Sequence, residues 1–151
     1  MRKFLIINFV LFAMSMNAQR KSYDFIIMVD EEIIPSMTNA RLVINKSKEI
    51  PIQYYPGNLS ISLTDSELLE SNIGEIILKF STNDYSGKEQ RVNNYEIEVG
   101  KNWFEKSYII LRIYNTYKKK YKKEFEPLKG KDYTFELEYA GGQMLQVRKH
   151  K

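Results

Sequence analysis

Residues 106–117, KSYIILRIYNTY, decide the fold class of this chain. Successive side chains of a strand point to opposite faces of a sheet, so Ile109, Leu111 and Ile113 share one face and Ile110 lies on the other. Apolar residues on both faces are typical of a central strand that is covered on both sides. We therefore predict that this segment is the core strand of a β protein.

Segments with alternating apolar and polar residues lie on both sides of this strand and predict further short strands. They span residues 22–29, 40–45, 50–55, 59–63, 75–80, 95–99, 132–139 and 143–148. Ala140-Gly141-Gly142 predicts a tight hairpin between the last two, since glycine supplies the positive φ that such a turn needs. Thr64–Glu67 matches a capping box and predicts one short helical turn that ends near Ser71.

Seven to nine strands and one helical turn, without strand–helix–strand alternation, predict an all-β fold, an antiparallel β-sandwich. Immunoglobulin-like and transthyretin-like topologies both fit this pattern. The chain has 151 residues, of which 43% are hydrophobic and 28% are charged, and these values are typical of one globular domain.

The first 19 residues, MRKFLIINFVLFAMSMNAQ, have the three parts of a secretory signal peptide. Arg2 and Lys3 give the positive start, residues 4–14 are apolar apart from one asparagine, and Ala18 is a small residue at the cleavage position. The apolar run is too short to span a membrane, and a core helix or strand is the alternative interpretation. We predict a signal peptide at 1–18 and a single β-sandwich domain at 19–151.

The ending Asn17-Ala18-Gln19 resembles the signal peptides of Bacteroidota, and the Lys-, Asn-, Tyr- and Ile-rich body is similar to small exported proteins of that group. The resemblance implies a lineage and no activity, whereas the signal peptide and the absence of cysteine predict export to the periplasm or the cell surface. The chain has no cysteine, so the exported domain must be held by its hydrophobic core without disulfide bonds.

The residue inventory excludes most catalytic machinery. Without cysteine there is no thiolate nucleophile, and the one histidine, His150, lies next to the last residue, where a terminus frays. No zinc-protease, phosphate-loop, nucleophile-elbow or dinucleotide motif occurs, and residues 30–32, Asp-Glu-Glu, lack the spacing of a calcium loop. We therefore expect a non-catalytic protein with no cofactor and no metal site.

Carboxylates support an alternative of another class, a hydrolase or an enzyme inhibitor that acts in the periplasm. Asp24, Glu136 and Glu138 qualify by residue type, although strand alternation places Glu136 and Glu138 on the solvent face of a sheet. Glycoside hydrolysis needs two carboxylates about 5–10 Å apart in a concave pocket, and such a pocket would favour this alternative.

The basic charge is concentrated late in the chain. Residues 19–100 carry eight basic and thirteen acidic side chains, whereas residues 101–151 carry thirteen basic and six acidic ones. The densest block opens the segment Lys118–Lys131, KKKYKKEFEPLKGK. Pro127 and Gly130 oppose a continuous helix or strand there, so we predict a loop whose first half projects into solvent with Tyr121 exposed among the lysines.

This loop is the predicted binding surface, because clustered positive charges attract an anionic partner. The expected partner is an anionic envelope component or an acidic protein surface, and an exported location makes nucleic acid an unexpected one. For the lysine block, the alternative interpretation is a solvated loop without a partner. For Trp103, the alternative is a side chain buried at the end of the core. The predicted binding residues are Trp103, Lys119, Lys120, Tyr121, Lys122 and Lys123.

Overall fold

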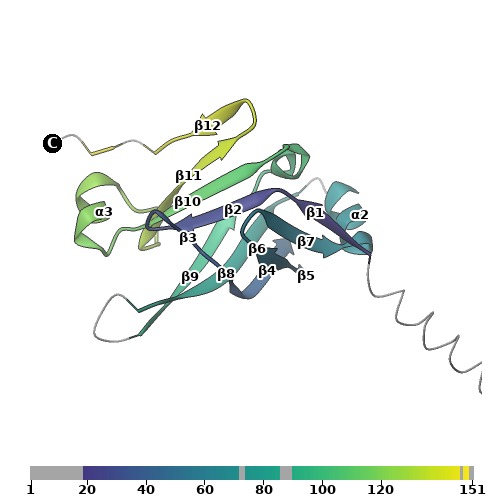
Figure 1. Ribbon diagram of the computed structural model, residues 1–151, viewed down its shortest axis with the longest axis horizontal. Helices are drawn as coiled ribbons and strands as arrows, with labels where there is room; N and C mark the ends of the chain where they lie inside the picture. The colour runs from purple at the N-terminus through teal and green to yellow at the C-terminus, as the bar shows by residue number, and fades with distance from the viewer. Residues whose placement is uncertain (1–18, 72–73, 86–89, 147, 150–151) are drawn as a thin grey trace, which may run out of the picture.

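The computed structural model describes residues 19–71, 74–85, 90–146 and 148–149. The predicted signal peptide, residues 1–18, and the single histidine lie outside the described residues. Within the described part, twelve strands form three sheets (Figure 1). Two α-helices and one 3₁₀-helix connect strands along the chain.

The core strand belongs to a five-stranded sheet of order β12-β11-β10-β2-β3 (Figure 1). The bounds are Phe25–Val29 for β2, Glu32–Ile33 for β3, Ile109–Asn115 for β10, Tyr133–Tyr139 for β11 and Gly142–Met144 for β12. β10 is the central strand, which confirms the prediction for residues 106–117 with narrower bounds. β2 and β10 run parallel, whereas the other pairings of the described strands are antiparallel.

The second sheet has the order β5-β4-β8-β9. The bounds are Thr38–Ile44 for β4, Lys48–Pro51 for β5, Ile76–Asp84 for β8 and Arg91–Glu98 for β9. The strands predicted at residues 75–80 and 95–99 are confirmed as β8 and β9, which pair with each other in antiparallel orientation. Both strands continue beyond those bounds, because the register extends to the pair Asp84 and Arg91.

The third sheet has the order β1-β7-β6, with β1 at Arg20–Tyr23, β6 at Gln53–Tyr55 and β7 at Asn58–Ser62. One residue, Asp24, separates β1 from β2, so the same extended chain runs from this sheet into the five-stranded sheet. β5 and β6 are likewise separated only by Ile52, whose backbone N–H donates to Ala40 C=O at 3.2 Å.

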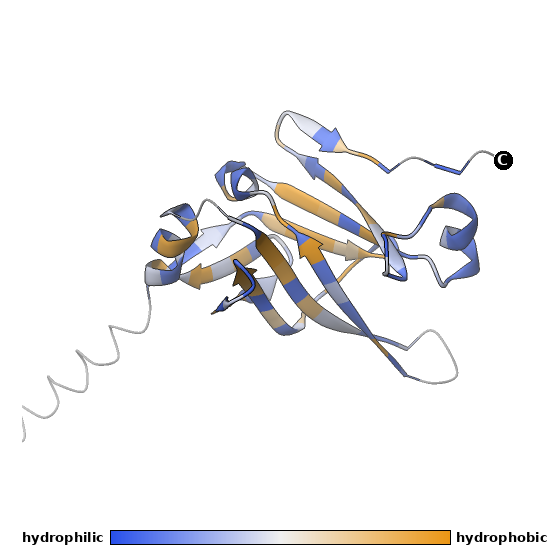
Figure 2. Cartoon of the chain, turned by 180° about the vertical axis from the view of Figure 1, so that it is seen from behind, coloured by the Kyte–Doolittle hydropathy of each residue, from blue (hydrophilic) through white to orange (hydrophobic). Residues whose placement is uncertain are grey.

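One hydrophobic core fills the space between the sheets, and every sheet contributes alternate side chains to it. Figure 2 shows the result as alternating hydrophobic and hydrophilic bands along the strands. Leu111 of β10 is fully buried, as are its register partner Ile27 of β2 and Leu42 of β4 in the second sheet. The all-β, sandwich-like fold predicted from the sequence is therefore confirmed.

The predicted helical turn is a helix of nine residues, α2, at Leu63–Ser71. Its cap is Ser62 rather than the predicted Thr64. The Oγ atom of Ser62 accepts a hydrogen bond from the backbone N–H of Asp65 at 3.1 Å and donates one to the Asp65 carboxylate at 2.7 Å. This reciprocal bonding satisfies a backbone donor at the start of the helix.

Left-handed residues close the two hairpins of the five-stranded sheet. Gly141, with φ of 90°, turns β11 into β12, which confirms the predicted hairpin. Asp30 and Glu31, with φ of 54° and 73°, turn β2 into β3. Positive φ at both central residues is the geometry of a type I′ hairpin turn. Because this turn also fixes the backbone of Asp30, it contributes to the site described next.

Candidate functional site

The lysine-rich segment folds as a short helix, α3, at Lys119–Glu124. Tyr121 is buried, with 4% of its surface exposed, so the prediction of an exposed Tyr121 in a projecting loop is wrong. The spacing of four residues puts Tyr121 and Phe125 on one side of the helix. Both rings contact Tyr114 of β10, with centroid distances of 5.3 Å for Tyr121 and 4.5 Å for Phe125. We call these three residues the aromatic platform.

The C-terminal segment covers the outer face of the five-stranded sheet beside this platform. The Tyr114 hydroxyl donates to Glu136 at 3.1 Å, and Arg148 pairs with the same carboxylate at 3.2 Å while lying 4.0 Å from the Phe125 ring centroid. Glu136 is only 3% exposed, so its predicted place on a solvent face is wrong. Burial first, and the Glu136 charge second, raise the pKa of Tyr114 to about 12.

The other two carboxylate candidates remain closer to solvent. Glu138 is partly exposed and forms an ion pair with Arg112 at 2.7 Å across the β10–β11 pair. Asp24 is exposed in the one-residue step between β1 and β2. Glu136, Glu138 and Asp24 therefore occupy different environments and do not form a paired site.

The five lysines at 118–123 divide into three kinds. Lys118 turns inward, with Nζ at 2.8 Å from Asp30 Oδ2 and 2.9 Å from Asp84 Oδ2. Lys120 forms an exposed ion pair with Glu31. The remaining lysines are exposed and form no ion pair with the residues that the structure describes. These are Lys119, Lys122 and Lys123.

Lys119, Lys122 and Lys123 share one face of α3, because residues three and four apart on a helix are neighbours. This face is opposite to Tyr121, which points into the aromatic platform. Figure 2 shows α3 as a predominantly hydrophilic helix. We call these three residues the lysine face.

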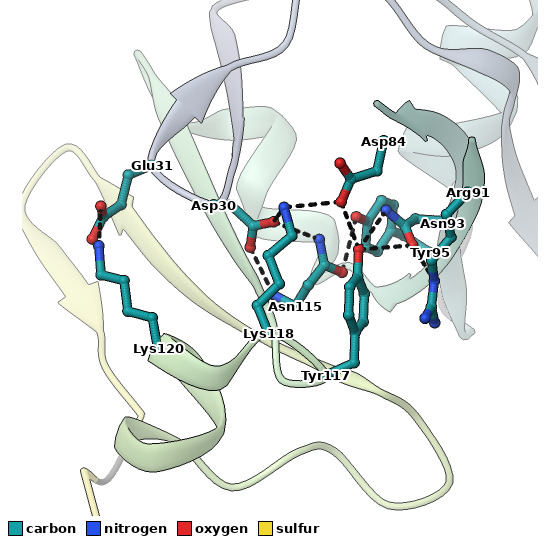
Figure 3. A network of polar contacts seen from close by, with 10 residues as sticks. All are labelled: Asp30, Glu31, Asp84, Arg91, Asn93, Tyr95, Asn115, Tyr117, Lys118 and Lys120. Atoms are coloured by element: carbon teal, nitrogen blue, oxygen red, sulfur yellow. Dashed lines mark hydrogen bonds and ion pairs between the residues drawn. The ribbon is translucent and has the colours of Figure 1, made fainter. Parts of the chain in front are cut away.

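A network of polar side chains surrounds Lys118 at the end of β10 (Figure 3). Asp30 accepts hydrogen bonds from the backbone N–H of Asn115 at 2.8 Å and from its Nδ2 at 2.9 Å. The Oδ1 atom of Asn115 in turn accepts a bond from the Tyr95 hydroxyl at 3.1 Å. The turn between β2 and β3 is thereby tied both to β10 and, through Tyr95, to β9.

The network continues from Asp84 to the edge of the second sheet (Figure 3). The Tyr117 hydroxyl donates to Asp84 Oδ2 at 2.8 Å and lies 3.2 Å from Asn93 Nδ2. The Arg91 guanidinium covers the Tyr117 ring at 3.7 Å from the centroid. Four segments that are distant in sequence therefore meet in the network around the Lys118 ammonium.

Burial and charge set the titration of the network. Desolvation, the largest single effect, lowers the pKa of Lys118, but the hydrogen bonds and charges of Asp30 and Asp84 outweigh it and raise this pKa above its ordinary value. Desolvation raises the pKa of Tyr95 to about 12 and also raises that of Tyr117, where the bond to Asp84 adds to the effect. The ammonium stays charged and the two hydroxyls stay protonated at neutral pH.

The network forms the floor of a pocket of about 530 Å³, which we call the polar pocket. Asp30 and Asp84 bind the same ammonium, so their bonded oxygens lie less than about 6 Å apart, an upper bound that admits the shorter spacing of paired carboxylates in glycosidases. The remaining lining comes from residues 29–35 and 82–85, from one residue each of β9 and β10, from Lys118 and from two residues of α3. These residues are Val29, Glu32, Ile33, Ile34, Pro35, Thr82, Asn83, Tyr85, Asn93, Asn115, Lys118, Lys120 and Tyr121.

Trp103 does not join this site. It lies in the 3₁₀-helix at Lys101–Glu105, half-buried against the core, where the chain enters β10. α3 follows the other end of β10 (Figure 1). The length of the central strand separates Trp103 from the lysines, so the prediction of one surface containing both is wrong.

Sequence reasoning missed Asp84, Asn93, Asn115 and Tyr117 as members of the site. They come from β8, β9, β10 and the segment after β10, and no spacing along the chain connects them. The only available signals were the unusual acidic turn at Asp30 and the lysine at 118. No group of three or more acidic or histidine side chains in the described part is arranged to hold a metal ion.

Among the residues that the structure describes, no helix is long and apolar enough to cross a membrane. Protein-family models, curated proteins and solved structures were all compared with this chain, and none matches it.

Proposed function

We propose that this protein is an exported, non-catalytic binding protein of the cell envelope. Its contact surface is the lysine face of α3, and its partner is an anionic envelope component. The signal-peptide pattern supports the location, because an exported chain would meet the charged glycans and lipid headgroups outside the inner membrane.

The observation that carries this proposal is the unequal pairing of neighbouring lysines. Lys118 has two carboxylate partners and Lys120 has one, whereas the lysine face has none among the described residues. Three like charges on one face of a helix repel one another. An anionic partner relieves that repulsion, and the resulting attraction is sensitive to salt.

Rigidity of the helix also supports a binding role. Tyr121 and Phe125 anchor one side of α3 in the aromatic platform, and Lys118 fixes its start to Asp30 and Asp84. The C-terminal segment holds its end, because Lys149 N–H donates to Glu124 C=O at 2.9 Å. A surface that is ordered before binding loses less conformational entropy when a partner arrives.

The test compares two triple variants in co-sedimentation with an isolated envelope fraction. The first is K119Q/K122Q/K123Q, which removes the lysine face. The control is K46Q/K48Q/K101Q, which removes the same charge from exposed positions elsewhere. We expect only the first variant to lose association. We also expect the wild-type association to weaken between about 0.1 M and about 1 M salt, because the Debye length falls from about 10 Å to about 3 Å.

Equal association of the two variants, or association that salt does not change, contradicts the proposal. Protease treatment of the envelope fraction identifies the alternative partner, an acidic protein. In one outcome, protease treatment abolishes the association, and K119Q/K122Q/K123Q associates more weakly than the wild type with the untreated fraction. The lysine face is then the contact surface, but its partner is a protein.

The paired carboxylates favour a second candidate function, a glycoside hydrolase that uses Asp30 and Asp84. The upper bound on the separation of their bonded oxygens admits the short spacing, about 5–5.5 Å, of retaining enzymes. The ammonium of Lys118 lies between them and binds both, which argues against this candidate, because a substrate oxygen would need that position. Release of reducing sugar from envelope glycans, lost in D30N and in D84N, would establish the hydrolase in place of the binding protein.

A further inference from the structure

We infer that the polar pocket binds a sugar ring of an acidic oligosaccharide whose charged groups contact the lysine face. This inference rests on the proposed function and specifies its ligand. The pocket volume of about 530 Å³ lies within the range of natural small-molecule sites, about 300–1,000 Å³.

The floor of the pocket supplies the polar chemistry that a sugar ring needs. Each sugar hydroxyl both donates and accepts hydrogen bonds, so a matching site must offer both kinds of group. Asp30 and Asp84 are acceptors, the Lys118 ammonium is a donor, and Asn83 and Asn93 supply amides that are both. A site for a simple anion or cation would present mainly one kind.

The floor is also held in place before any ligand binds. Lys118 uses two of its three N–H groups for Asp30 and Asp84, which leaves one donor for a ligand. The carboxylate of Asp30 accepts three bonds, from Asn115 and Lys118, and a carboxylate has about four lone-pair positions. The network thus fixes the side chains while capacity for further hydrogen bonds remains.

One part of the pocket rim is apolar, beside the exposed and charged Glu32 and Lys120, and this part suits the C–H faces of a sugar. Tyr85 is 71% exposed and Ile33 is 52% exposed, and both line the pocket. Large apolar side chains at a concave polar site are typical of ligand recognition, and tyrosine adds a polar tip to its apolar ring. Pro35 extends this rim with a side chain of fixed shape.

α3 connects the pocket to the lysine face. Lys118, Lys120 and Tyr121 line the pocket, and the lysine face lies on the solvent side of the same helix. A helix with its side chains is only about 10 Å across, so an oligosaccharide of several residues reaches from one to the other. The charge complementarity then selects sugars that bear carboxylates or phosphates.

The experiment measures binding of the mature protein to immobilised acidic oligosaccharides. These carry uronic acids or sugar phosphates, and each is matched with its carboxyl-reduced or dephosphorylated counterpart. The pocket variant is N83A/Y85A, and its control is N102A/Y55A, which removes an exposed asparagine and an exposed tyrosine outside the pocket. We expect the pocket variant to bind about tenfold more weakly than the control, a loss of about 1.4 kcal/mol of binding free energy.

The outcomes separate this inference from the proposed function. Equal binding by the pocket variant and its control overturns the sugar pocket, and if K119Q/K122Q/K123Q still lowers binding, the proposed function stands without it. Binding to neutral counterparts as strongly as to acidic ones overturns the role of the lysine face. The absence of binding to every acidic oligosaccharide overturns the inference, whatever the envelope co-sedimentation shows.

Discussion

The ammonium of Lys118 lies 2.9 Å from Asp84 Oδ2, which connects the end of β8 to the segment that follows β10. The same ammonium reaches Asp30 in the turn after β2. Both carboxylates are mostly buried, with 12% and 14% of their side chains exposed. The part-buried ammonium of Lys118 neutralises these two carboxylates and so stabilises the fold. The exposed lysines that follow it in the sequence do not have this role.

Replacement of Lys118 by methionine is expected to destabilise the protein by about 2–4 kcal/mol, because it leaves two mostly buried carboxylates without their cation. Lys119→Met is the matched control and should change the free energy of unfolding by less than about 0.5 kcal/mol, since Lys119 is exposed and unpaired among the described residues. Chemical denaturation of both variants measures the difference. Equal stabilities would show that the inward position of Lys118 contributes nothing.

Arg148 is expected to stabilise the C-terminal segment through Glu136. Arg148→Ala should cost about 1–3 kcal/mol, because it leaves the buried carboxylate with the Tyr114 hydroxyl as its main partner. In the background of Glu136→Gln, which carries no charge, the same Arg148→Ala change should cost much less. A double-mutant cycle measures this coupling. A coupling energy near zero would contradict the ion pair.

Alkaline pH is expected to destabilise the protein through Tyr95 and Tyr114, whose pKa values are raised to about 12. Between pH 10 and 12 the folded protein keeps protons that the unfolded chain releases, so the free energy of unfolding decreases as pH rises, by about 2–3 kcal/mol for each group. Denaturation at about pH 9 and about pH 11 should show about half of this decrease, because the full effect is reached only above about pH 12. The Y95F/Y114F variant should show a smaller decrease, and an unchanged one would assign the effect to other groups.

Export is expected to remove residues 1–18. Intact mass spectrometry of protein recovered from the envelope or the medium of an expressing bacterium should show Gln19, or its cyclised form, as the first residue. Recovery of a chain that still begins with Met1 would contradict the signal peptide, and with it the envelope location on which the proposed partner depends.

The strands were predictable because a half-buried sheet imposes its period of two on the sequence. Residues 106–117 carry apolar side chains at alternate positions, and β10 is indeed central. The turn at Gly141 was predictable from its composition, since the turn requires a positive φ. The parallel pairing of β2 with β10 was not, because local alternation is the same for parallel and antiparallel neighbours.

The candidate site was only partly predictable. The lysine block predicted the location of the charged surface. The four-residue spacing of Tyr121 and Phe125, which puts both rings on the buried side of a helix, was overlooked because the surrounding residues are charged. Glu136 follows the alternation of β11, and its burial depends on a C-terminal segment that returns to cover it. The polar pocket depends on residues that only the tertiary fold brings together, Asp30, Asp84 and Lys118 among them.

The central claim, that the lysine face binds an anionic envelope component, is tested most directly by nuclear magnetic resonance. The isotopically labelled mature protein is titrated with the soluble, phosphate-bearing core oligosaccharide of lipopolysaccharide at low and at high salt. We predict that the amide signals that shift belong to residues 118–124 and to the lining of the polar pocket, and that high salt suppresses the shifts. Shifts confined to the surroundings of Trp103, or no shifts at low salt, would contradict the claim.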